Sequence, residues 1–123
     1  MVLYNKRKID ERQTARVSKG MNELAGIFSK PVGGSGSKWQ AKGDVFSSLF
    51  LAECKDKEKP SKQRTIYKDH LNKIRLEAIN ENKIPLYIVA FGDGQDYMIL
   101  HDHDFYELMD ELITLRKLRD GDV

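Results

Sequence analysis

Two acidic residues and one lysine occupy positions from which they could form one reactive site. Asp44 opens the apolar run Asp44-Val45-Phe46, and Glu53 and Lys55 close the next apolar run along the chain. Carboxylate oxygens are hard ligands that suit Mg²⁺, and a lysine beside them can stabilise negative charge on a reacting phosphate. This combination predicts metal-dependent hydrolysis of a phosphodiester.

The spacing of these residues fits a β-hairpin. Side chains alternate along a strand, so Glu53 and Lys55, two residues apart, share one face. If the hairpin turns evenly about residues 47–48, Asp44 lies opposite Leu51 and about 7–8 Å from Glu53 on the diagonal. A slip of one residue in this register would move Asp44 to the other face and destroy the site.

The elements that must position these residues follow from the pattern of apolar residues. We expect helices over residues 7–24 and 64–82, and a last helix with Phe105, Met109, Leu112 and Arg116 in one line. Strands are expected over residues 27–28, 44–46, 49–52, 86–91 and 97–100. The order α-β-β-β-α-β-β-α predicts one α/β domain over residues 1–123, with a mixed β-sheet flanked by helices.

The composition indicates a globular protein without a membrane segment. Of the 123 residues, 40% are hydrophobic and 33% are charged. No apolar run approaches the roughly 18 residues that span a bilayer, and no signal peptide is visible in residues 1–8. The single cysteine, Cys54, fits a reducing cytoplasm, and we expect its thiol to be a small core group on the face opposite Glu53.

The charge is distributed unevenly along the chain. Residues 1–75 carry 17 Lys or Arg against 8 Asp or Glu, whereas residues 76–123 carry 4 against 11. A basic surface made by the first part would attract a polyanion such as DNA. A solvated surface of mixed charge is the alternative interpretation.

These motifs together resemble the PD-(D/E)xK nucleases, and within them the small Holliday junction resolvases of archaea and phages. The resemblance runs from about residue 8 to residue 106. It rests on the glycine-serine loop at residues 33–37, Lys42-Gly43-Asp44-Val45, Glu53-Cys54-Lys55, and the helix leading to Ala78 and Lys83-Ile84-Pro85.

The resemblance implies a restriction-endonuclease-like fold and a magnesium-dependent endonuclease, with Mn²⁺ as a substitute for Mg²⁺. It assigns metal binding to Asp44, Glu53 and the backbone carbonyl of Cys54, and assistance in catalysis to Lys55. It also implies a homodimer that cuts branched DNA at four-way junctions in the cytoplasm, the host cytoplasm if a phage encodes it. Flap, nicked or duplex DNA are alternative substrates, and a nucleic-acid-binding module that does not cut is an alternative function.

One feature of the family is not matched cleanly. The family usually has a helical glutamate before the glycine-serine loop as a further metal-site carboxylate, and here Thr14 occupies that position. Glu11, on nearly the same helical face, could replace it, although it could also simply favour the helix N-terminus, and Glu23 is a third choice. Ser35 and Ser37 are the candidates for a functional serine in the loop, which could equally be a plain turn.

Several basic and aromatic residues are candidate DNA contacts. Trp39 could stack on an unpaired base or pack at a loop or dimer contact, and Tyr67, which follows Gln63 by four residues, is expected in the core. The candidate backbone contacts, which an ordinary solvated surface would also explain, are Lys38, Lys42, Lys62, Arg64 and Lys68.

The last helix raises two further questions. His101-Asp102-His103-Asp104 has the residue types of a metal cluster, but we interpret Asp102 or Asp104 as the helix N-cap. Leu115 and Leu118 are apolar residues outside the line formed by Phe105, Met109, Leu112 and Arg116. They either form a dimer seam or complete the core.

Overall fold

The computed structural model describes residues 6–32 and 43–121. In chain order the elements are α1 (Lys6–Glu23), β1 (Ser29–Pro31), β2 (Val45–Ser47), β3 (Phe50–Lys55), α2 (Lys68–Asn80), β4 (Ile84–Ala90), β5 (Asp96–Ile99) and α3 (Asp102–Asp120). This order confirms the predicted α/β class and sequence of elements. The first strand lies two residues later than expected, since Ile27 packs against the core ahead of it.

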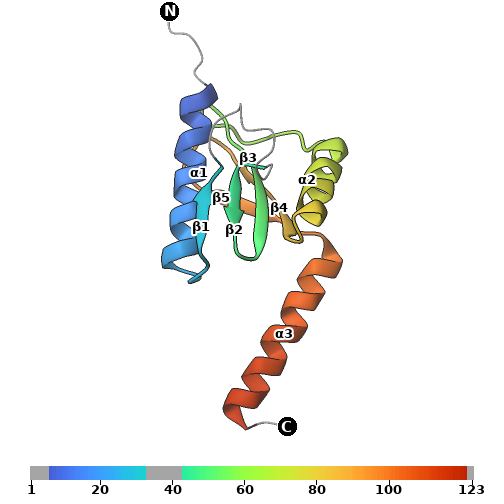
Figure 1. Ribbon diagram of the computed structural model, residues 1–123. Coiled ribbons are helices and arrows are strands. Elements are labelled where there is room, and N and C mark those ends of the chain that lie inside the picture. The colour runs from blue at the N-terminus through green and yellow to red at the C-terminus, as the bar shows by residue number, and fades with distance from the viewer. Residues whose placement is uncertain (1–5, 33–42, 122–123) are drawn as a thin grey trace, which may run out of the picture.

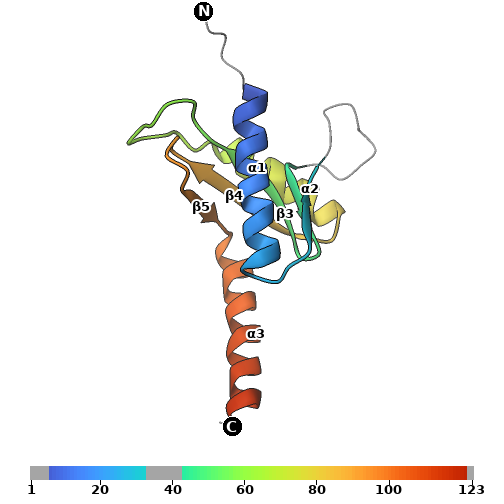
Figure 2. The same cartoon turned by 90° about the vertical axis from the view of Figure 1, so that its left-hand side faces the viewer.

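The five strands form one mixed sheet in the order β1-β2-β3-β4-β5. Neighbouring strands are antiparallel except β3 and β4, which are parallel and connected through α2. Helix α1 covers one face of the sheet and α2 covers the other, while α3 extends away from the sheet (Figures 1 and 2). Burial on both faces explains why residues 86–90 of β4 are continuously apolar.

Each face of the sheet has its own hydrophobic cluster. Under α1 lie Val17, Met21, Val45, Ala52, Cys54, Leu86 and Ile88. Under α2 lie Leu51, Ile74, Ala78, Tyr87 and Val89. Alternation along β3 therefore directs Ala52 and Cys54 toward α1, and Leu51, Glu53 and Lys55 toward α2.

The hairpin between β2 and β3 differs from the predicted register by two residues. Val45 pairs with Ala52 and Phe46 with Leu51, so Asp44 is not opposite Leu51. The turn falls one residue later because the buried hydroxyl of Ser47 accepts hydrogen bonds from the backbone N–H groups of residues 49 and 50, at 3.2 and 2.6 Å. An even shift preserves the faces, so the predicted site survives the correction.

The second helix is shorter than predicted. It begins at Lys68, because Tyr67 has an extended backbone with φ −96° and ψ 130°. Tyr67 was expected in the core, but 57% of its surface is exposed. Its ring instead lies 5.1 Å from that of His70. Residues 56–67 between β3 and α2 are not helical, so Tyr67 precedes the helix instead of lying on its buried face.

No helix within the described ranges is both long and apolar enough to span a bilayer.

Candidate functional site

Asp44 is fixed at the edge of β3 by two backbone contacts. Its N–H donates to the carbonyl of Ala52 at 2.7 Å, and its carboxylate Oδ2 accepts the N–H of Cys54 at 2.7 Å. Gly43, with φ +84°, permits this approach, because a Cβ there would lie 3.0 Å from both the Ala52 carbonyl and the Leu51 side chain. The glycine before Asp44 therefore allows the loop to approach β3 closely.

Glu53 is an acidic group whose pKa is strongly raised. Its side chain is 16% exposed. Burial and the negative charge of Asp44 together raise the pKa of Glu53 from 4.5 to about 7, against the opposing effects of Lys55 and Lys73. The half-buried carboxylate of Glu53 thus faces the negative charge of Asp44, an arrangement that a bound cation would stabilise.

Lys55 lies beside this pair. Its Nζ is 3.6 Å from Oε1 of Glu53, and its side chain is 28% exposed. Its backbone carbonyl accepts hydrogen bonds from Nε2 of Gln13 at 3.2 Å and from Nη1 of Arg64 at 2.9 Å. The end of β3 is therefore held from both sides, which limits the positions that the lysine side chain can reach.

Cys54 has the orientation predicted for it. Its side chain is buried in the cluster under α1. Its N–H points toward Asp44, and the carbonyl of a strand residue points to the same edge as its N–H. The backbone carbonyl of Cys54 is thus directed to the edge of β3 that carries the Asp44 carboxylate.

Arg64 has a structural role that sequence reasoning missed. Besides Lys55, its Nη1 donates to the carbonyl of Ala90, so the guanidinium connects the ends of β3 and β4. These contacts lie within the fold, and the prediction that Arg64 also binds the DNA backbone stays a prediction. Gln13, fully buried, ties α1 to β3 and β4 through the carbonyls of Lys55 and Ile88.

Helix α2 contributes a third carboxylate that the sequence did not single out. Glu77 adds to the negative charge that raises the pKa of Glu53, and Lys73 opposes it. Oε1 of Glu77 is 3.9 Å from Nζ of Lys73, and Oε2 is buried without a hydrogen-bond partner among the described residues. The sequence indicated Glu77 only through its spacing, because Lys73 and Glu77 are one helical turn apart on the face of α2 that carries Ile74 and Ala78.

Replacing Glu77 by glutamine is expected to lower the pKa of Glu53, because one of the negative charges facing it disappears. The free energy of unfolding changes with pH as Glu53 ionises. The midpoint of this change should therefore move down by about half a pH unit. Denaturant unfolding followed across pH 5–9 measures this. Glu81→Gln, in the exposed position at the end of α2, is the matched control and should leave the profile unchanged. An unshifted midpoint in the Glu77 variant would remove Glu77 from the site.

Tyr87 completes the wall of the site next to Glu53, with which it pairs across β3 and β4. Its hydroxyl lies 3.1 Å from Nδ1 of His70. Burial raises the pKa of Tyr87, the Arg64 charge opposes this, and the Glu53 charge adds to it. Tyr87 and His70 thus form a polar pair beside the acidic cluster, on the side of α2.

The helical carboxylates proposed from the sequence are not brought to this face. Glu11 and Glu23 are exposed on α1, which covers the opposite face of the sheet. Thr14 is buried, and its hydroxyl donates to the backbone carbonyl of Glu11 at 3.1 Å. The carboxylate that a helix supplies near Glu53 is Glu77 of α2.

Five further candidate residues lie outside the described residues: Ser35, Ser37, Lys38, Trp39 and Lys42.

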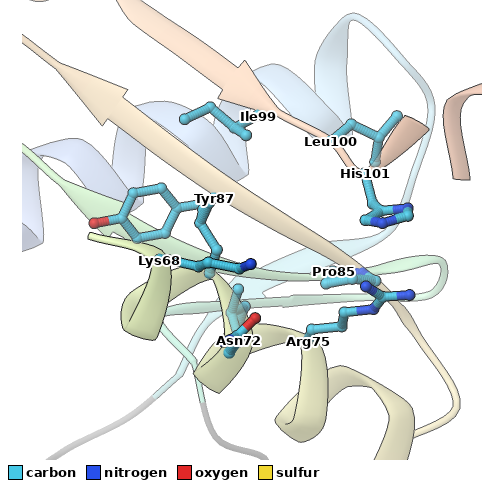
Figure 3. A pocket seen from close by; sticks show the side chains of 10 residues that line it. Lys68, Asn72, Arg75, Pro85, Tyr87, Ile99, Leu100 and His101 are labelled. Atoms are coloured by element: carbon cyan, nitrogen blue, oxygen red, sulfur yellow. The ribbon is translucent and has the colours of Figure 1, made fainter. Parts of the chain in front are cut away.

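Two candidate DNA contacts do lie on the surface. Lys62 and Lys68 are exposed, and Lys68 lines a pocket of about 350 Å³ between α2 and the strands β4 and β5. Lys68 and Arg75 extend along the α2 side of this pocket, and Tyr87, Ile99 and His101 line the other side (Figure 3).

The histidine-aspartate run before α3 has a capping role. His101, rather than Asp102 or Asp104, is the N-cap, and its Nδ1 accepts the N–H of His103 at 3.3 Å. The acidic residues occupy the first turn, where negative charge suits the helix dipole. Across residues 6–32 and 43–121, no three His, Cys, Asp or Glu side chains are grouped so as to hold a metal ion.

Comparisons with models of protein families, with curated proteins and with solved structures found no match.

Proposed function

We propose that the protein is a metal-dependent endonuclease of the restriction-endonuclease-like fold that acts on branched DNA. The observation that carries this proposal is the pairing of Asp44 with Glu53 at one end of the sheet, with Lys55 3.6 Å from Glu53. The two residues that follow Glu53 support the proposal: the carbonyl of Cys54 is directed to the edge of β3 that carries Asp44, and the ammonium of Lys55 lies beside Glu53.

The donor set fits Mg²⁺. Asp44, Glu53 and the Cys54 carbonyl would hold the ion, and it would supply an acidified water and neutralise charge on the phosphate. The raised pKa of Glu53 supports this, because a half-buried carboxylate that faces the negative charge of Asp44 is stabilised by a cation. The remaining coordination positions suit water and phosphate oxygens, as Mg²⁺ sites with few protein ligands usually have.

The residues around the pair have separate tasks. Lys55 stabilises negative charge that builds up on the phosphate in the transition state, since its ammonium already lies beside the carboxylate pair. Gln13 and Arg64 hold the backbone of Lys55 in place. Lys62 and Lys68, both of which are exposed, would contact the DNA backbone.

The substrate is proposed to be a four-way junction cut by a homodimer, because two symmetric cuts need two active sites. A cleavage assay with a labelled four-way junction tests this against matched duplex, flap and single-strand controls, with Mg²⁺ and with chelator. Paired nicks at the junction that need Mg²⁺ are the expected result. Equal cutting of all substrates would keep the nuclease and remove the junction preference, and tight binding without cutting would favour a binding module.

A further inference from the structure

The pocket between α2 and the strands β4 and β5 has an apolar lining. Helix α2 packs mainly on β3 and β4, whereas β5 is the edge strand of the sheet, so a hollow remains beside β5. Leu71, Ile74 and Ile99 line it and also belong to the hydrophobic cluster under α2. Its volume of about 350 Å³ suits one small ligand.

Two basic residues of α2 line one side of this pocket. Lys68 and Arg75 are close to two helical turns apart, so both lie on one face of the helix with Asn72 between them. Both are exposed, and neither side chain has an ion-pair partner in residues 6–32 and 43–121. No Asp or Glu is among the described residues that line the pocket. Its positive charge would therefore attract an anion.

The third basic group is His101, on the opposite side of the pocket. Ile99 pairs with Tyr87 in the antiparallel ladder, so two residues further along the chain His101 lies level with Pro85. In Figure 3 the guanidinium of Arg75 and the ring of His101 both lie at this end of the pocket. An anion at the Pro85 end would therefore meet both groups.

The cap of α3 sets the hydrogen-bond role of His101. Its Nδ1 accepts the N–H of His103 at 3.3 Å, so the neutral ring carries its proton on Nε2. Oδ1 of Asp102 is 3.0 Å from the same Nδ1, and in the charged ring both nitrogens carry protons. His101 can therefore donate a hydrogen bond through Nε2 in either charge state.

We propose that this pocket binds a single nucleotide, with its phosphate between Arg75 and His101 and its base against the apolar lining at Leu71 and Ile99. A guanidinium suits the geometry of a phosphate. The apolar lining favours a ligand that also has a flat apolar body, which inorganic phosphate lacks. The amide of Asn72 can donate to or accept from the polar edge of a base.

The nucleotide pocket shares one residue with the wall of the acidic site. Tyr87 lines the pocket and pairs with Glu53 across β3 and β4. The Pro85 end of the pocket lies two residues back along β4, about 7 Å from Tyr87. If the protein cuts branched DNA, which is the proposed function, an unpaired nucleotide next to the cut would enter this pocket. A free nucleotide has the same chemistry and is the other source of the ligand.

A titration of the full chain with deoxyadenosine 5′-monophosphate, followed by NMR in the presence of chelator, tests the pocket. The nucleotide should bind with a Kd of about 1 mM or tighter and shift the signals of residues 68–75, 85–87 and 99–101. Inorganic phosphate alone and deoxyadenosine alone should each bind at least about tenfold more weakly. Absence of nucleotide binding, or equal binding of inorganic phosphate, would overturn the proposal.

Substitutions at the phosphate end locate the site. Arg75→Gln should weaken nucleotide binding at least about tenfold, and His101→Asn about threefold or more, since asparagine can still cap α3. Arg12→Gln is the matched control, because Arg12 is exposed on α1, which covers the other face of the sheet. It should bind within about twofold of the original chain. Circular dichroism checks that each variant is folded, and a folded Arg75 variant with unchanged binding would contradict the site.

A second measurement distinguishes the two sources of the nucleotide. Fluorescence anisotropy in chelator compares a duplex that has one unpaired nucleotide with the same duplex fully paired. A preference of at least about fivefold for the unpaired nucleotide, lost in Arg75→Gln, identifies the DNA strand as the source. Equal binding of the two duplexes, with nucleotide binding intact, identifies a free nucleotide. Because no step uses a metal or cleavage, failure of the nuclease proposal and failure of the pocket are separate results.

Discussion

Replacing Asp44 by asparagine is expected to reduce metal-dependent DNA cleavage by at least about 100-fold while leaving DNA binding intact. Asparagine keeps an oxygen that can accept the N–H of Cys54, so the loop retains its anchor to β3. What is lost is the negative charge and one of the two proposed carboxylate ligands. A single-turnover cleavage assay with saturating Mg²⁺, together with a binding titration in chelator, separates these effects.

The control for this experiment is Asp69→Asn. Asp69 is exposed in the first turn of α2 and takes no part in the site, so its variant should cleave within about twofold of the original chain. Unchanged cleavage by the Asp44 variant would exclude Asp44 as a ligand, whereas loss of both binding and cleavage would indicate that the loop had lost its structure. Alanine is the less informative choice, because it removes the Cys54 contact as well as the charge.

The sequence predicted the parts of this fold that depend on local periodicity. The alternation of apolar residues in β3 was enough to place Glu53 and Lys55 on one face and Cys54 on the other. The hairpin register was wrong by two residues, because the turn depends on the Ser47 hydroxyl, and a serine pair alone does not show which hydroxyl closes the turn. The site survived only because the error was even.

The contributions of distant elements could not be read from the sequence. Glu77 meets Glu53 only because α2 crosses β3 at a particular point, and no pattern within α2 fixes that crossing. From the sequence, Arg64 was either a DNA contact or part of a solvated surface. In the structure its guanidinium also connects the ends of β3 and β4. Likewise, the sequence left open whether Leu115 and Leu118 complete the core, and the structure leaves both exposed.

Ionisation of Glu53 is expected to lower the free energy of unfolding as pH rises. Its pKa is about 7 in the folded chain against an ordinary value of 4.5, so between these values the folded state holds a proton that the unfolded state has lost. Stability from this group is therefore fully present below about pH 4.5 and is lost as pH rises through 7. The shift corresponds to about 3 kcal/mol at most.

Glu53→Gln should accordingly raise the free energy of unfolding by about 1–3 kcal/mol at pH 8 and by almost nothing at pH 5, where the native side chain is already neutral. Denaturant unfolding at the two pH values, without divalent ions, measures the difference. A variant that is less stable than the original chain at pH 8 would mean that the fold itself neutralises Glu53, and the argument for a cation there would fail.

Mg²⁺ provides the complementary measurement on the same pair of proteins. A cation held by Asp44 and Glu53 binds the folded chain only, so it should raise the midpoint of thermal unfolding of the original chain, and more at pH 8 than at pH 5. Glu53→Gln should lose most of that increase, because the ligand that Mg²⁺ neutralises is gone. An equal increase in both proteins would place the ion elsewhere. Because neither measurement uses DNA, the pair tests the metal site separately from the identity of the substrate.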